Sequence, residues 1–261
     1  MDPKSEEKFK RLFKMTNKYG INVTILKPHL MLPNFGDWIN RAEYSPTDTA
    51  VFFSRWQSIL LYYANICDKY GIPILSLSSE TMKLTDEKYY YQWESIVMKI
   101  KKKYPDLKLT IAFNMNEFNR ELQYFEQNKK SVSEILEYTS LNMYPNILRS
   151  RTNGKTIERD NFHEFINSIK KAKEYFGKDI LITETGATAR SDNSKDYITA
   201  IVLDTTKPSD HLDQNQWTKI VLRQLLNINE VKGVYLWHVD YPFNFFDSST
   251  FETVHEIYSE S

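Results

Sequence analysis

The sequence predicts an α/β fold of the (β/α)8 TIM-barrel-like type, in an incomplete form with six recognisable βα strands. Short apolar runs alternate with longer segments of helical periodicity, which favours parallel strands joined by helices. Each predicted strand also ends in polar or aromatic residues, and chemistry gathered at the carboxyl ends of successive strands is typical of a barrel. A doubly wound sheet usually carries a glycine-rich phosphate loop, and neither GxGxxG nor GxxxxGK[ST] occurs here.

The predicted strands are short runs rich in apolar and β-branched residues, with little polar alternation in their first halves, as expected of strands covered on both faces. They are 21–32, 73–80, 107–114, 138–145, 179–186 and 231–240. The predicted helices are amphipathic, and several of them end at Gly or Pro. They are 5–20, 49–71, 86–105, 128–137, 161–177 and 214–229.

The longest stretch without a predicted element is 186–213, directly after the fifth strand. A loop of that length in a compact domain is usually functional or disordered. Because it follows the carboxyl end of a strand, we expect it to form a wall of a substrate cleft. No repeat or linker divides the chain, so 1–261 is interpreted as a single barrel-type domain.

Composition excludes several classes of function. The 261 residues carry 34 basic and 34 acidic side chains, so no overall field attracts nucleic acid or an anionic membrane. No apolar run approaches the roughly 20 residues that span a bilayer. Cys67 is the only cysteine, which excludes a disulfide framework, and its helical surroundings predict a buried thiol. No secretory signal is visible, which leaves a cytoplasmic protein or a secreted one with its signal removed.

Two predicted strands end in a glutamate, Glu80 in LSLSSE and Glu184 in ILITETG. In one barrel both carboxyl groups would point into the same cleft. Hydrolysis of a glycosidic bond needs such a pair, with one acid to protonate the leaving oxygen and one carboxylate to attack the anomeric carbon. We therefore expect these two residues to carry the chemistry.

The runs LKPHL, SSE, FN, NMYP, ITETG and YLW, in that order, resemble the strand ends of clan A glycoside hydrolases. The resemblance is strongest to glycoside hydrolase family 113, a group of β-mannanases and related barrel domains. That family has a Lys-Pro-His strand, a loop with Trp, a Glu on strand four, a Tyr on strand six, a Thr-Glu-x-Gly run on strand seven and a Trp on strand eight. The match extends from about residue 20 to 240 by order and spacing.

The resemblance implies a role for each matching residue. Glu80 would be the acid/base and Glu184 the nucleophile of a retaining, mannanase-like enzyme on β-linked hexose polymers. Tyr144 would orient the nucleophile, and Trp237 would support the sugar next to the scissile bond. Further substrate-binding residues would be Lys27, His29, Trp38 and Asn114. The resemblance implies a carbohydrate substrate, and no cofactor or metal.

Two departures from the family accompany the resemblance. The first strand here corresponds to the family's third, so the first two βα units are missing from this alignment. An open sheet leaves unpaired edges, and a homo-oligomer or a partner could close it. Many clan A enzymes also place Asn before the acid/base, where this chain has Ser79.

Two alternatives stay open beside the retaining glycosidase. One is a carbohydrate-binding barrel with weak or no activity, its sheet completed by a second copy or a partner. The other is a barrel enzyme of different chemistry, an aldolase or isomerase that uses Lys27 as its amine.

Overall fold

The computed structural model divides the chain into two compact units. The first consists of Met1–Ile111 and Glu134–Glu137, and the second of Ala112–Ser133 and Tyr138–Ser261. The residues that the structure describes are 3–31, 38–148, 162–190, 197–204, 206–207, 211–240, 242–246 and 248–260.

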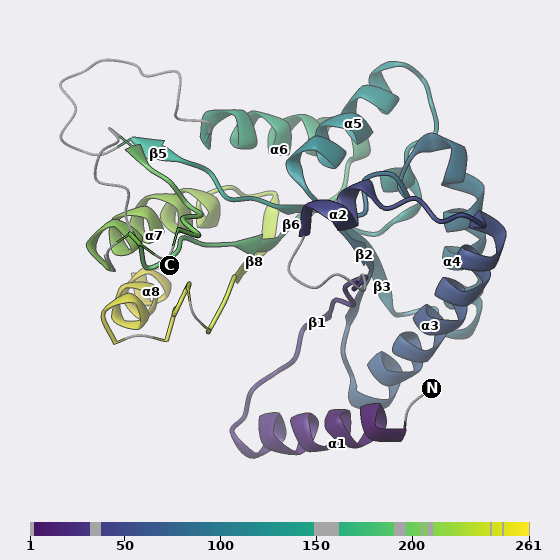
Figure 1. The fold of residues 1–261 in the computed structure, drawn as a ribbon, viewed down its shortest axis with the longest axis horizontal. Helices are drawn as coiled ribbons and strands as arrows, with labels where there is room; N and C mark the ends of the chain where they lie inside the picture. The colour runs from purple at the N-terminus through teal and green to yellow at the C-terminus, as the bar shows by residue number, and fades with distance from the viewer. Residues whose placement is uncertain are drawn as a thin grey trace. The chain divides into compact units, whose positions relative to one another are not determined.

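The first unit alternates helices and strands, as the sequence predicts (Figure 1). Its elements are α1 (Pro3–Lys18), β1 (Ile25–Leu26), α2 (Trp38–Glu43), α3 (Thr49–Tyr70), β2 (Ile74–Ser79), the 3-10 helix Glu87–Tyr89, α4 (Tyr90–Lys103) and the first residues of β3 (Lys108–Phe113).

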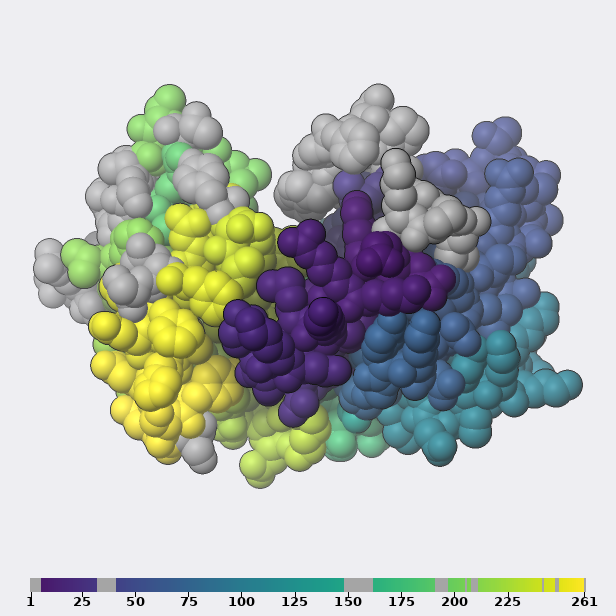
Figure 2. Space-filling view, turned by 90° about the horizontal axis from the view of Figure 1, so that it is seen from below, coloured from purple at the N-terminus to yellow at the C-terminus, as the bar shows by residue number. Residues whose placement is uncertain are grey.

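Local sequence signals explain the bounds of α3, the longest helix of the first unit. Asp48 caps its start by accepting a hydrogen bond from the Val51 N–H at 2.9 Å. Gly71 ends it in the left-handed region at φ 69°, which favours glycine. The ring of Phe13 on α1 stacks on Tyr70 at 4.0 Å between centroids, and Figure 2 shows α1, in dark purple, at the surface. The core of this unit is therefore closed by contacts between helices.

The second unit continues the alternation (Figure 1). Its elements are the end of β3, α5 (Met115–Glu126), β4 (Thr139–Asn142), β5 (Ile147–Leu148), α6 (Phe162–Phe176), β6 (Ile180–Thr185), β7 (Tyr197–Ile198), α7 (His211–Leu226), β8 (Val231–Leu236) and α8 (Ser248–Glu260); a 3-10 helix, Val132–Ile135, lies at the boundary of the units. Helix α8 packs on α7, and Figure 2 shows its outer face, in yellow, at the surface.

The strands confirm the predicted α/β class. Their order in the sheet is β1-β2-β3-β4-β6-β8. In the first unit β1 pairs in parallel with β2; in the second, the end of β3 pairs with β4, β4 with β6, and β6 with β8, all in parallel. Parallel neighbours require helical crossovers, which is why strand and helix alternate along the chain. Strands β5 and β7 form a separate antiparallel pair.

The structure differs from the predicted elements in several places, and it contains α2, β5 and α8, which the sequence does not predict. The predicted strand 21–32 is reduced to β1, whose two residues are only half-buried. The predicted helix 128–137 contains only the 3-10 turn Val132–Ile135, and the helix of this region is α5, which begins after Asn114. Within 186–213, β7 pairs with β5, and α7 begins at His211. In the described part of the chain, no helix is long and apolar enough to cross a membrane.

Candidate active site

Glu184 lies near the carboxyl end of β6, where it faces a residue from the neighbouring strand. Its side chain is buried, with the residue only 5% exposed. The Tyr144 hydroxyl, just beyond the end of β4, donates a hydrogen bond to Glu184 Oε2 at 2.8 Å. A phenol at this distance orients the carboxylate and offsets part of the cost of burying it.

Strand pairing places Glu184 and Tyr144 together. Asn142 of β4 is in register with Glu184 of β6, and Met143 N–H donates to the Glu184 carbonyl at 2.8 Å. One residue earlier, the Thr183 hydroxyl donates to Asn142 Oδ1, also at 2.8 Å. Backbone and side-chain bonds therefore hold these two strand ends in one geometry.

Trp237 follows directly on β8, the next strand of the same unit. Its backbone N–H donates to the Thr185 carbonyl at 2.8 Å, which joins it to the strand end that carries Glu184. Its ring meets that of His238 at 4.9 Å between centroids, His238 meets Phe243 at 5.4 Å, and Phe243 meets Tyr144 at 6.3 Å. An aromatic series therefore leads from Trp237 to the Tyr144 ring.

Gly186 completes the Thr-Glu-x-Gly run for a steric reason. A Cβ built on it would overlap the Trp237 carbonyl oxygen and would lie 2.9 Å from the Phe245 ring. Only a residue without a side chain allows this close approach of the segments that follow β6 and β8. The glycine of the motif thus serves the packing around Glu184.

Glu80 follows β2 in the first unit and has an unusual backbone conformation. Its φ is 53°, in the left-handed region that non-glycine residues rarely occupy. The residue is 9% exposed. Strained backbone of this kind costs on the order of 1–3 kcal/mol and concentrates at functional sites. The conformation therefore supports a functional interpretation of Glu80.

Arg41 joins two of the predicted site residues in the first unit. Its Nη2 donates to Glu80 Oε2 at 2.6 Å, in an ion pair whose side chains are 11% and 12% exposed. Its Nη1 lies 3.1 Å from His29 Nδ1. Sequence reasoning missed Arg41 because it stands in α2, away from every strand end, and no motif marks it.

His29 is held uncharged by its surroundings. Burial, together with the positive charges of Lys27 and Arg41, lowers its pKa to about 4, against a smaller opposing effect of Glu80. An uncharged imidazole nitrogen accepts a hydrogen bond, so Nδ1 can accept from Arg41 at neutral pH. The first unit thus gathers Lys27, His29, Arg41 and Glu80 into one electrostatic cluster.

Two other predicted site residues, Asn114 and Trp38, lie at the starts of helices. Asn114 is the N-cap of α5: its Oδ1 accepts from Glu117 N–H at 3.0 Å, and its own N–H donates to Glu117 Oε2, also at 3.0 Å. Trp38 begins α2, but its side chain lies outside the described residues. The second unit brings together Tyr144, Glu184 and Trp237.

Other reactive groups are accounted for structurally. Cys67 is fully buried in α3, and burial raises its pKa to about 12, as expected of a thiol without nucleophilic character. Among the described residues, no three His, Cys, Asp or Glu side chains form a group that could hold a metal ion. The groups available near the described strand ends are carboxylates, a phenol, an aromatic surface, the Lys27 amine and the His29 imidazole.

The chain is similar to a known protein family in its sequence and to solved structures in its fold. The model of glycoside hydrolase family 113 matches residues 3–259. No curated protein matches the sequence.

Among solved structures, the chain is similar to a family 113 β-1,4-mannanase complex, at 15% identity and a TM-score of 0.71, covering 96% of this chain and 78% of that one. It is equally similar to a family 113 β-mannanase from Alicyclobacillus acidocaldarius in complex with ManMIm, at 15% identity and a TM-score of 0.70, covering 96% and 77%. It is also similar to a structure of fungal β-1,4-galactanases, at 14% identity and a TM-score of 0.59, covering 88% of this chain and 71% of that one. At these identities the similarity establishes the fold, and it agrees with the predicted barrel class.

Proposed function

The chain belongs to glycoside hydrolase family 113, and we propose that it is a retaining glycoside hydrolase acting on a β-linked hexose polysaccharide or oligosaccharide. The hydrogen bond from Tyr144 to Glu184 is the observation that carries this proposal. A buried carboxylate with one oxygen held by a phenol presents its other oxygen in a defined direction. A nucleophile that attacks an anomeric carbon needs that orientation.

In the proposed first step, Glu184 attacks the anomeric carbon and forms a glycosyl ester. The bond to the leaving oxygen breaks, and Glu80 gives that oxygen its proton. In the second step, water attacks the same carbon while Glu80 takes a proton from the water. The ester bond breaks, and Glu184 is released as a carboxylate. Two displacements at one carbon retain the configuration of the sugar.

The remaining predicted residues bind the substrate in this proposal. Trp237, half-buried after β8, offers an aromatic face to a pyranose ring. Lys27, His29, Asn114 and Trp38 contribute polar or aromatic contacts. We further propose an endo-acting specificity for β-mannan, supported by family membership and by the mannanases among the similar folds.

Glu184→Gln tests the proposal. The substitution keeps the size and the Tyr144 contact but removes the nucleophile, so hydrolysis of an activated aryl β-mannoside should fall to background with the melting temperature preserved. Glu174→Gln, an exposed change on α6, is the matched control and should keep full activity. Unchanged turnover in Glu184→Gln would refute the assignment of the nucleophile.

Azide distinguishes the two carboxylates. In Glu80→Ala the glycosyl ester still forms, and added azide should release a glycosyl azide of retained configuration. In Glu184→Ala the azide replaces the nucleophile itself and should give the inverted product. The opposite pattern would exchange the two roles.

One observation favours a second candidate function, carbohydrate binding without turnover. Glu80 enters the Arg41 ion pair as a carboxylate, whereas the first step requires its protonated form. The ion-paired carboxylate can act directly as the base of the second step. In the first step, Glu80 must instead carry a proton and give up its ion pair with Arg41. Binding of β-mannan by the unaltered chain without release of reducing sugar would favour this second function.

A further inference from the structure

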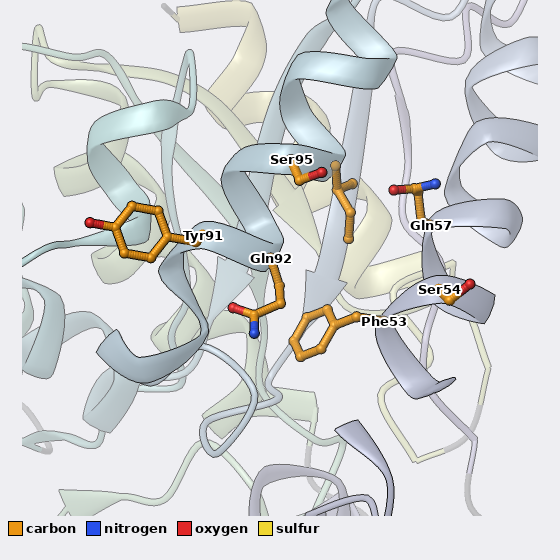
Figure 3. A pocket seen from close by; sticks show the side chains of 7 residues that line it. Phe53, Ser54, Gln57, Tyr91, Gln92 and Ser95 are labelled. Atoms are coloured by element: carbon orange, nitrogen blue, oxygen red, sulfur yellow. The ribbon is translucent and has the colours of Figure 1, made fainter. Parts of the chain in front are cut away.

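A pocket on the first unit is lined by residues that are not among those of the candidate active site. It is formed by two neighbouring helices, α3 and α4, and has a volume of about 310 Å³. This volume is at the lower end of the range of small-molecule pockets, about 300–1,000 Å³. Its side chains include Phe53, Ser54 and Gln57 from α3, and Tyr91, Gln92 and Ser95 from α4 (Figure 3).

The lining of this α3–α4 pocket is uncharged, and it includes carboxamides, hydroxyls and two aromatic residues. Figure 3 shows Gln92 and Phe53 pointing toward one another from the two helices, whereas Tyr91 points away from them. No lining side chain carries a charge, and the ammonium of Lys99 is engaged by Gln57 Oε1 at 2.8 Å. A neutral ligand with many hydroxyl groups fits these carboxamides and hydroxyls.

The two carboxamides have different hydrogen-bonding capacity. The Oε1 of Gln92 is buried and has no hydrogen-bond partner within the described part of the chain. A buried acceptor without a partner is costly, and a hydroxyl donated by a ligand would satisfy it. The Oε1 of Gln57 accepts from Lys99 Nζ at 2.8 Å, which directs the Gln57 amide group and leaves its N–H bonds as donors.

Phe53, one of the lining residues, is held in an aromatic cluster. The Phe53 ring is 5.5 Å from Trp93 and 5.3 Å from Tyr89, between centroids. Trp93 is fully buried, and its indole N–H donates to the Leu84 carbonyl at 2.8 Å. A site whose side chains are already ordered loses little conformational entropy when a ligand binds.

We propose that the α3–α4 pocket is a second carbohydrate-binding site, which takes one sugar unit of a neutral β-linked hexose polymer. This inference rests on the proposed function, because the polymer would be the one that the enzyme hydrolyses. Gln92 accepts from a sugar hydroxyl, and Gln57 and Ser95 contribute further polar contacts. Phe53, only 5% exposed, contributes apolar packing beside the polar groups and no stacking face. Holding the polymer here raises its local concentration around the enzyme.

Native electrophoresis in gels that contain soluble galactomannan tests this site. The Glu184→Gln background keeps the polymer intact, and a second substitution, Gln92→Leu, removes the acceptor at nearly constant volume. We expect Gln92→Leu to raise the dissociation constant for galactomannan, measured from the retardation, by about five- to tenfold. This is the change expected on loss of one buried hydrogen bond. Gln123→Leu, the same change at an exposed position of α5, is the control and should leave retardation unchanged.

Ser95→Arg provides a second variant that does not disturb buried packing, because Ser95 is exposed on α4. The longer side chain would fill the pocket and should also reduce retardation. Without the Glu184 substitution, both pocket variants should hydrolyse an aryl glycoside at the unaltered rate. Retardation that is absent, or equal in all these variants, would overturn the site even if the enzyme is active. Retardation that depends on Gln92 in a chain without hydrolase activity would keep the site and refute the proposed function.

Discussion

At the scale of single residues, the contact between Tyr144 and Glu184 has the largest expected effect on chemistry. A neutral donor at 2.8 Å from a buried carboxylate stabilises one orientation of that group. In the proposed mechanism the same phenol remains beside the glycosyl ester, so its removal should act on turnover more than on stability.

Tyr144→Phe tests this expectation. Loss of a hydrogen bond to a charged group, about 1.5–3 kcal/mol, should lower kcat by roughly 10- to 100-fold. Tyr175→Phe is a matched control, because the Tyr175 hydroxyl donates to exposed Glu126 at 2.7 Å. Initial rates and melting temperatures of both variants should separate the two positions. Equal kinetics for Tyr144→Phe and the unaltered enzyme would contradict the role of Tyr144.

The Arg41–Glu80 pair leads to a second expectation at this scale. Both side chains are nearly buried, and removal of one partner from such a pair leaves an uncompensated charge. We expect Arg41→Met to cost about 3 kcal/mol of unfolding free energy at pH 7, and the double variant Arg41→Met with Glu80→Gln to recover part of it. Urea denaturation of the four proteins of this double-mutant cycle measures the coupling. A coupling energy within about 0.5 kcal/mol of zero would mean that the pair contributes nothing.

At the scale of elements, periodicity predicted the strands better than the helices. Strands β2, β3, β4, β6 and β8 lie within predicted runs, because a buried parallel strand is a short apolar segment that stands out from its neighbours. Helix α5 was missed although Asn114 and Glu117 form a capping box at its start. Asn114 is also a predicted substrate-binding residue. An Asn at a strand end can cap the next helix or line a cleft, and the sequence alone does not distinguish these two roles.

Gly186 gives a prediction at this scale, because two elements meet at it. A Cβ there overlaps the backbone of Trp237, which cannot move without displacing the segment after β8. We expect Gly186→Ala to cost about 3 kcal/mol and to lower activity, since Glu184 is two residues away. Gly177→Ala has open space around it but a φ of 67°, so it should cost only about 1 kcal/mol. Chemical denaturation of the two variants distinguishes overlap from backbone strain, and equal costs would contradict the steric explanation.

At the scale of the whole molecule, buried ionisable groups connect stability to pH. Glu121 of α5 is 1% exposed and accepts hydrogen bonds from the Ser131 hydroxyl at 2.7 Å and the Ser133 N–H at 3.2 Å. Burial outweighs these bonds and raises the pKa of Glu121 to about 6. The folded state therefore binds this proton more tightly than the unfolded state. The stability that results is complete below pH 4.5 and is lost as pH rises through about 6.

Glu121→Gln should remove this loss. Relative to the unaltered chain, the variant should gain about 2 kcal/mol of unfolding free energy between pH 4.5 and about 6.5. The control Glu126→Gln should show no such gain between pH 4.5 and about 6.5. Hydrogen bonds from Tyr175 and Lys171 lower the pKa of that exposed carboxyl, so the stability it contributes is present above pH 4.5 and is lost only at lower pH. Urea denaturation over a pH series measures both differences, and a pH-independent difference for Glu121→Gln would refute the assignment.

Two predictions about the whole molecule stay predictions. The first is that 1–261 acts as one catalytic domain, and the second is that an oligomer or a partner closes the sheet. Gel filtration with light scattering, at concentrations above and below those used for activity assays, would test the oligomer.

The sequence by itself determined the alternation of strand and helix, the membership of a glycoside hydrolase family and two glutamates at strand ends. These are local or serial properties, because apolar periodicity and the order of short motifs are written along the chain. The tertiary structure alone decided that Arg41 pairs with Glu80, that Asn114 caps a helix, and that Gly186 lies against Trp237. Arg41 and Glu80 are 39 positions apart in the sequence, and Gly186 and Trp237 are 51 positions apart, so folding of the chain brings each pair together. Folding also decides that the Asn114 carboxamide binds the start of α5.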